Sequence, residues 1–133
     1  MKKVFCSIMV IMVLIACSKD KDVSSPDLIN AWLLIENYND PGDGSGGFNP
    51  VQNGRTIEFL ADGTVTTTVS FCDQSQTTYG MTAVYDTTNK QIIVNDCNEI
   101  EYTIEYTIEG QNLLLAFQCI EGCWEKYRLT TIF

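Results

Sequence analysis

The chain has 133 residues, of which 45% are hydrophobic and 19% are charged, a composition typical of one folded domain rather than of a disordered segment. Its 17 acidic and 8 basic residues give a net charge of −9, which argues against nucleic acid as a partner. The sequence contains no histidine, so catalysis by Ser-His-Asp or Cys-His groups is excluded, as is any metal site that needs imidazole.

The first residues have the features of a signal peptide. Lys2 and Lys3 precede an apolar stretch over residues 4–15, which is shorter than the roughly 20 residues of a transmembrane helix. The stretch ends in Leu14-Ile15-Ala16-Cys17, which resembles a bacterial lipobox. The resemblance implies cleavage before Cys17 and attachment of the lipid to this cysteine. An ordinary secretory signal with an incidental cysteine is the alternative.

This reading divides the chain into three parts. Residues 1–16 are the signal peptide, residues 17–27 are the lipidated cysteine and a polar tether, and residues 28–133 are the folded domain. We therefore expect the protein to be held in the cell envelope by its lipid, on the outer membrane. Whether it faces the periplasm or the cell surface stays open.

Beyond residue 28, apolar and polar residues mostly alternate, which is typical of strands with one buried and one solvent-facing side. The clearest example is residues 102–109, where Tyr and Ile alternate with Thr and Glu. Turn signals such as Asp62-Gly63 and Gly110-Gln111 separate the runs. The pattern predicts eight strands, at Ile29–Asn37, Arg55–Leu60, Thr64–Phe71, Thr78–Tyr85, Gln91–Asn95, Glu101–Glu109, Asn112–Gln118 and Trp124–Ile132.

Eight short strands joined mainly by tight turns predict an all-β fold, an eight-stranded antiparallel up-and-down barrel, because closure removes the exposed sheet edges. A transmembrane barrel is a poor fit, since it needs strands of about 9–11 residues and would turn Glu105 and Glu109 toward hydrocarbon. The apolar face should therefore point inward. A sandwich of two sheets fits the same alternation and is the structural alternative.

Three segments resemble the lipocalin-like domains of small lipoproteins of Bacteroidetes. They are Leu28-Ile29-Asn30-Ala31-Trp32, Thr56-Ile57-Glu58-Phe59 and Ala61-Asp62-Gly63-Thr64-Val65, with Asn30 where lipocalins favour glycine. The resemblance covers residues 28–133 and implies a lipocalin-like barrel. It also implies a structural role for Trp32, over which Arg128 or Lys126 would pack by a cation–π contact.

Alternate connections of an up-and-down barrel share one end, so four connections of this chain should lie together, at residues 38–54, 72–77, 96–100 and 119–123. The last three hold all four cysteines of the folded domain, and an extracytoplasmic compartment permits disulfides. We predict the pairs Cys119–Cys123 and Cys72–Cys97, with Gly122 in a left-handed turn position. A metal site of four thiolates is the alternative. The tether should enter at the opposite end, so the cysteine-bearing end would point away from the membrane.

The first of these connections contains a segment rich in Gly and Asp, residues 39–47. A flexible lid or an Ω-loop is expected here, and a weak calcium loop is the alternative. Carboxylates gather in the connections at this end and would favour a neutral or cationic molecule over an anionic one, unless they serve only solubility. They are Asp40, Asp43, Asp73, Asp96, Glu99 and Glu121.

An eight-stranded barrel has room for side chains alone or for one small ligand. The inward positions expected from the alternation are Ile57, Phe59, Val69, Phe71, Met81, Tyr85, Tyr102, Ile104, Tyr106, Ile108, Leu113, Leu115, Phe117, Tyr127 and Leu129. Four of them stand toward the cysteine-bearing ends of their strands and are the candidate ligand contacts: Phe71, Tyr102, Phe117 and Tyr127.

No nucleophile motif or phosphate-binding glycine pattern occurs, and the carboxylates are expected on outward positions or at loop tips. We therefore expect no enzyme, no cofactor and no resident metal. The first functional hypothesis is a membrane-anchored protein that binds a small hydrophobic, neutral or cationic molecule in its barrel. The alternative is a surface accessory or inhibitor protein with a filled core that binds another protein through its loops. An apolar cavity would favour the first hypothesis, and a filled interior with an exposed apolar patch the second.

Overall fold

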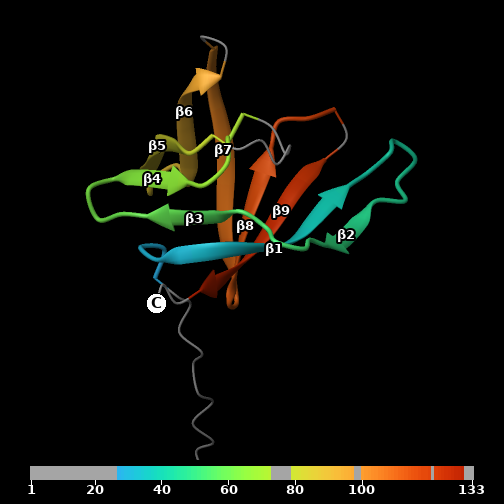
Figure 1. Cartoon of the computed structure of the whole chain (residues 1–133). Coiled ribbons are helices and arrows are strands. Elements are labelled where there is room, and N and C mark those ends of the chain that lie inside the picture. Colours follow the sequence, from blue (N-terminus) through green and yellow to red (C-terminus); the bar gives the residue numbers. More distant parts are fainter. Residues whose placement is uncertain (1–26, 73–78, 98–99, 121, 131–133) are drawn as a thin grey trace, which may run out of the picture.

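The computed structural model describes residues 27–72, 79–97, 100–120 and 122–130 (Figure 1). The signal peptide, Cys17 and most of the tether lie outside these residues. The described chain folds into nine strands: β1 (Ala31–Asn39), β2 (Gly47–Pro50), β3 (Thr56–Phe59), β4 (Thr64–Thr67), β5 (Met81–Asp86), β6 (Gln91–Cys97), β7 (Ile100–Glu109), β8 (Asn112–Phe117) and β9 (Cys123–Thr130). Across those four ranges there is no helix with the length and apolarity to cross a membrane.

Eight of the strands form a closed antiparallel barrel, as predicted. They follow the order β1, β3 and then β4 to β9, and β1 also pairs with β9. The closure is visible at Ala31, which is opposite Glu58 of β3 on one side and opposite Thr130 of β9 on the other. Continuous pairing around the ring rules out the two-sheet sandwich.

One strand, β2, was not predicted. It lies where a lid or an Ω-loop was expected after the first strand, so that expectation was wrong. Residues 47–50 pair with residues 36–39 of β1, so the second half of β1 and β2 form a hairpin that extends beside the barrel, to the right in Figure 1. Gly47 and Pro50 are poor strand formers, which hid this strand from the sequence pattern. Contact between Tyr38 and Phe48, whose ring centroids are 5.3 Å apart, supports the pairing.

Two aspartates organise the tip of this hairpin. Asp40 Oδ1 accepts hydrogen bonds from the backbone N–H groups of Gly42 and Gly44, at 2.8 and 3.1 Å. Asp43 Oδ1 accepts one from the N–H of Ser45 at 2.9 Å. Backbone hydrogen bonds, that of Gly42 first, lower the pKa of the Asp40 carboxyl group, and hydrogen bonds from the hydroxyl and then the N–H of Ser45 lower the pKa of Asp43. The Gly/Asp composition of the segment is thereby accounted for by turn chemistry.

The apolar faces of the eight strands meet inside the barrel. Trp32, Tyr127, Phe59 and Phe71 are the largest completely buried side chains. Most predicted inward residues are buried or pack against this core. Leu129 is opposite the inward-facing Trp32, as predicted, but it lies near the end of β9 and its side chain is 37% exposed.

Trp32 is structural, but its partner differs from the expected one. Its indole Nε1 donates a hydrogen bond to the carbonyl oxygen of Leu28 at 3.1 Å. Lys126 instead places its Nζ 4.1 Å from the centre of the Phe48 ring, and Arg128 is exposed. The predicted cation–π contact on Trp32 is therefore wrong, because the side chains at 126 and 128 face outward while Trp32 faces inward.

Both disulfides form as predicted and lie at the same end of the barrel. The Cα atoms of Cys72 and Cys97 are 5.3 Å apart, and those of Cys119 and Cys123 are 6.0 Å apart. This excludes the four-thiolate metal site. Gly122 has a φ of 84°, the left-handed conformation expected for it. The first described residues are at the other end, where the carbonyl oxygen of Asn30 accepts a hydrogen bond from the N–H of Phe59.

Candidate functional site

A buried ion pair stands inside the barrel near the disulfide-bearing end. Arg55 Nη2 lies 2.5 Å from Glu125 Oε2, and both side chains are almost completely buried. Arg55 Nε donates to the hydroxyl oxygen of Tyr127 at 2.9 Å, and the Tyr127 hydroxyl donates to Glu125 Oε2. We call Arg55, Glu125 and Tyr127 the polar cluster. Its three groups hold one another in a closed triangle.

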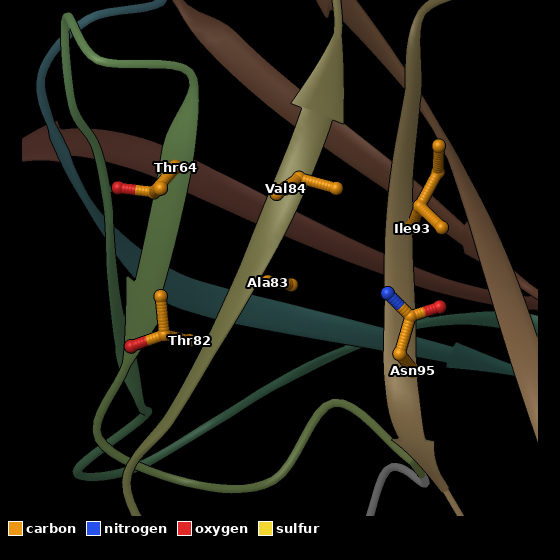
Figure 2. A pocket seen from close by; sticks show the side chains of 6 residues that line it. All are labelled: Thr64, Thr82, Ala83, Val84, Ile93 and Asn95. Carbon is orange, nitrogen blue, oxygen red and sulfur yellow. The ribbon is translucent and has the colours of Figure 1, made fainter. Parts of the chain in front are cut away.

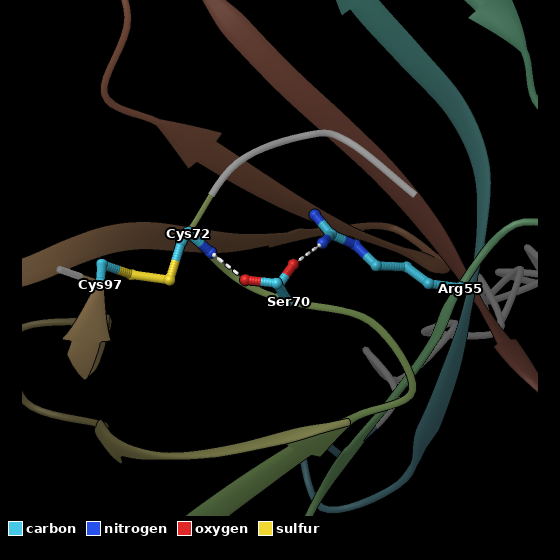
Figure 3. Close-up of a disulfide and its surroundings, with 4 residues drawn as sticks. All are labelled: Arg55, Ser70, Cys72 and Cys97. Carbon is cyan, nitrogen blue, oxygen red and sulfur yellow. Dashed lines mark hydrogen bonds between the residues drawn. A yellow bond between two sulfur atoms is a disulfide. The ribbon is translucent and has the colours of Figure 1, made fainter. Parts of the chain in front are cut away.

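The polar cluster is tied to the disulfide Cys72–Cys97. Arg55 Nη1 donates to the backbone carbonyl oxygen of Ser70, and the Ser70 hydroxyl accepts from the N–H of Cys72 at 3.0 Å (Figure 3). All three guanidinium nitrogens therefore have acceptors. The segment after β4 is thus fixed by a covalent bond on one side and by Arg55 on the other.

The backbone at Gly54 and Arg55 approaches the backbone of Leu34 closely, and this approach places Arg55 inside the barrel. A Cβ atom at Gly54 would overlap the backbone carbonyl of Leu34, so only glycine fits here. The Leu34 N–H donates to the Arg55 carbonyl oxygen at 3.0 Å. This contact sets Arg55 at the entrance of β3, two residues before the buried Ile57 and on the same face.

Two of the four predicted ligand contacts adjoin the polar cluster, and a third belongs to it. Arg55 Cζ lies 5.9 Å from the ring centre of Phe71 and 5.3 Å from that of Phe117, while Tyr127 is part of the cluster. The Tyr102 hydroxyl accepts a hydrogen bond from the N–H of Gln118, the residue after Phe117, at 2.8 Å. The structure therefore brings the predicted residues together at one end, around two charged residues that were not predicted.

Glu125 contradicts the expectation that every carboxylate lies outward or at a loop tip. Its side chain is 0% exposed, and its second oxygen, Oε1, has no hydrogen-bond partner among the described residues. A signal was present in the sequence: Glu125 stands two residues before Tyr127, and Arg55 two residues before Ile57, both of which were predicted to point inward.

The electrostatics of the polar cluster keep it overall neutral. Burial, together with the adjacent charge of Glu125, raises the pKa of Tyr127 well above its ordinary value, so its hydroxyl stays protonated. Burial would lower the pKa of Arg55, but the interactions with Tyr127 and Glu125 outweigh it and raise this pKa. One cation and one carboxylate therefore balance each other in an apolar surrounding.

The interior around Phe71 and Tyr127, two of the four predicted ligand contacts, is filled. Phe71, Tyr127, Leu113 and Leu115 have no solvent-accessible surface. A void large enough for a water molecule against any of these side chains would give it accessible surface. A ligand at this place would therefore have to displace side chains that now pack together.

Pockets of the described chain lie on the outside of the barrel wall and at one barrel end. The pocket in Figure 2 has a volume of about 300 Å³ and stands where β5 and β6 diverge, because only three residue pairs join these strands. It is lined by Thr64, Thr82, Ala83, Val84, Ile93 and Asn95, which bring hydroxyl and amide groups but no titratable side chain. Two others, of about 210 and 440 Å³, lie outside β6–β8 and at the end opposite the disulfides.

A row of aromatic side chains lies on the outer face at the disulfide-bearing end. Phe48 of β2 is opposite Tyr38 of β1, and Tyr38 is opposite Trp124 of β9. We call these three residues the aromatic row. Phe48 and Trp124 are each 40% exposed, and Ile120, on the turn that precedes β9, is 98% exposed. The turn borders the row, since a Cβ atom at Gly122 would lie 3.6 Å from the indole nitrogen of Trp124.

A charged pair borders the aromatic row. Lys126 Nζ lies over the Phe48 ring and forms an ion pair with Glu36 Oε2. Both side chains are partly exposed. This pair extends the row with a cation and a carboxylate.

The predicted acidic rim is described only in part. Asp40 and Asp43 take part in the hairpin tip, and the side chain of Asp96 and residues 73, 99 and 121 lie outside what the structure describes. Among the described side chains, no group of three or more Cys, Asp or Glu residues is placed to hold a metal ion.

Comparison of the chain with known protein families, curated proteins and solved structures finds no significant match.

Proposed function

We propose that the protein is a lipid-anchored, lipocalin-like barrel that binds another protein through the aromatic row. The observation that carries this proposal is the contrast between the two sides of β9. Inside, Glu125 and Tyr127 belong to a filled core, while outside, Trp124 adjoins an exposed aromatic and aliphatic surface. Exposed apolar patches of this kind are typical of protein interfaces.

The residue types of the row support a protein partner. Trp and Tyr are enriched among the residues that carry most of the binding energy in interfaces, and large aromatic rings lose little conformational entropy when they are buried. Tyr38 is partly buried between Phe48 and Trp124, so the row is already ordered before binding. A preorganised surface of this kind loses less entropy on association.

The position of the row agrees with an anchored protein. Residues 27–30, which follow the tether, lie at the opposite end of the barrel from Cys123 and the aromatic row. A lipid on Cys17 would thus leave the row facing away from the membrane. We propose binding without catalysis, because the polar cluster is closed to water and its donors are already engaged.

The test is cross-linking in cells that make the protein naturally, with the full chain. Trp124→Ser and Phe48→Ser should each remove the cross-linked partner that the wild type captures. Val84→Ser and Leu129→Ser are the matched controls, because these residues are similarly exposed but lie away from the row, and they should keep the partner. Loss of the partner in the controls as well, or its retention in the row variants, would contradict the proposal.

One observation favours a second candidate function, the binding of a small neutral molecule inside the barrel. Within the part of the chain that the structure describes, Glu125 Oε1 is a buried acceptor without a donor, a rare condition in folded proteins. A hydroxyl or amide N–H would satisfy this oxygen without adding a charge to a balanced cluster. Native mass spectrometry of the protein from its own cells tests it: a retained molecule that is lost in Glu125→Gln would support it, and a mass equal to that of the lipidated chain alone would count against it.

A further inference from the structure

We propose that the surface beside the aromatic row is a binding site for a cationic side chain, and that an arginine of the partner protein takes the place now held by Lys126. The inference rests on the proposed function, since it names the chemistry of the partner that the row binds. Three features carry it: a bound cation of the chain itself, a carboxylate beside it, and the charge of the surrounding surface.

Lys126 shows what the site binds. Its Nζ lies 4.1 Å from the centre of the Phe48 ring, within the range of a cation–π interaction, and it is also paired with Glu36. An aromatic face and a carboxylate therefore converge on one cation. Tyr38 also contacts Phe48, with its ring 5.3 Å from that of Phe48 and at 61° to it.

The lysine can be displaced at low cost. About a quarter of the Lys126 side chain and about a third of the Glu36 side chain are exposed, and ion pairs of such exposure contribute only about 0–1 kcal/mol. A guanidinium is planar, more weakly hydrated than an ammonium, and able to bind a carboxylate through two N–H groups. An arginine would therefore bind Glu36 and the Phe48 ring better than the lysine that it replaces.

The surrounding charge favours a basic partner. Asp40 and Asp43 stand at the tip of the same hairpin, where backbone N–H groups donate hydrogen bonds to both carboxylates. The whole chain carries a net charge of −9. A basic segment of a partner meets a complementary field here, whereas an acidic one is repelled.

The experiment measures binding of a short arginine-containing peptide to the purified chain, with Trp124 fluorescence as the signal. The control ligand is the same peptide with citrulline, which has the same shape but no charge. We expect the arginine peptide to bind more tightly than the citrulline peptide, and Lys126→Met to raise its affinity about threefold, because no lysine has to be displaced. Glu36→Gln and Phe48→Leu should abolish the difference between the two peptides.

Two results would overturn the inference. One is equal binding of the two peptides to the wild type, and the other is an unchanged or weaker affinity in Lys126→Met while Trp32 keeps its buried emission. Neither result would touch the proposed function if Trp124→Ser still removed the cross-linked partner. Conversely, arginine binding without any effect of Trp124→Ser on cross-linking would reject the proposed function alone.

Discussion

Arg55 and Glu125 are 70 residues apart in the sequence, yet the guanidinium Nη2 and the carboxylate Oε2 are 2.5 Å apart inside the barrel. The pair joins the entrance of β3 to the start of β9, on opposite sides of β1. Because β1 is the strand that closes the barrel, the pair spans the closure from the inside. Its energetics should therefore differ sharply from those of an ion pair on the surface.

We predict that Arg55→Met lowers the free energy of unfolding by about 3–5 kcal/mol, because it leaves the Glu125 carboxylate buried without its cation. The double variant Arg55→Met/Glu125→Leu should be more stable than Arg55→Met alone, since neither charge then remains. Urea unfolding followed by circular dichroism gives these values. Lys126→Met is the control for an exposed pair and should cost no more than about 1 kcal/mol. A double variant less stable than Arg55→Met would contradict the prediction.

The pKa of Tyr127 predicts how stability changes in alkali. Burial and Glu125 raise the pKa of this hydroxyl well above its ordinary value of 10.0 in the folded chain. Above about pH 10 the unfolded chain loses this proton while the folded chain keeps it, so the contribution is present below that pH and is lost as the pH rises. The free energy of unfolding should fall less steeply between about pH 9 and about pH 11 in Tyr127→Phe than in the wild type.

The matched variant for this experiment is Tyr106→Phe. Burial also raises the pKa of Tyr106, but less strongly, and its hydroxyl donates to the carbonyl oxygen of Asp86 at the other end of the barrel. Its replacement should reduce the alkaline slope by a smaller amount. Equal slopes in Tyr127→Phe and the wild type would show that Tyr127 loses its proton in the folded state as easily as in the unfolded one.

The two disulfides should contribute unequally to stability. The bond Cys72–Cys97 closes a segment of 25 residues and the bond Cys119–Cys123 one of 4. Loop-closure entropy then predicts losses of about 3.5 kcal/mol for Cys72→Ser/Cys97→Ser and about 2 kcal/mol for Cys119→Ser/Cys123→Ser. Thermal unfolding of the two double variants measures the order. The reverse order would mean that Ser70 and Arg55 hold the first segment without help from the disulfide.

The barrel and both disulfides were predictable because each follows from local rules that agree with one another. The alternation of apolar and polar residues predicts which side chains point inward, and the turn residues predict the hairpins. The order of the hairpins in turn places Cys72, Cys97, Cys119 and Cys123 at the same end of the barrel. Strand β2 was missed because Gly47 and Pro50 have low strand propensity, and only pairing with β1 makes them a strand.

The polar cluster was missed for a different reason. The period-two pattern placed Arg55 and Glu125 on inward positions, but the high cost of burying one charge argued for exposing each of them. The cost of burying each charge is offset only when Arg55 and Glu125 form an ion pair. They can do so because β1 pairs with both β3 and β9, and the residue pattern of one strand does not reveal which strands pair. The aromatic row was missed likewise, since Phe48 lies on the unpredicted strand.

The two tryptophans allow a direct test of the filled core and the exposed row in one molecule. Trp32 is completely buried, whereas Trp124 is 40% exposed. Acrylamide should therefore quench most of the accessible fluorescence of the wild type through Trp124, and Trp124→Phe should leave a blue-shifted emission that acrylamide hardly reaches. Phe48→Ser, which removes the ring at the far side of Tyr38, should increase quenching of Trp124 without changing Trp32. Strong quenching in Trp124→Phe would mean that solvent enters the barrel beside Trp32. The interior would then not be filled, and an internal ligand would be favoured over a protein partner.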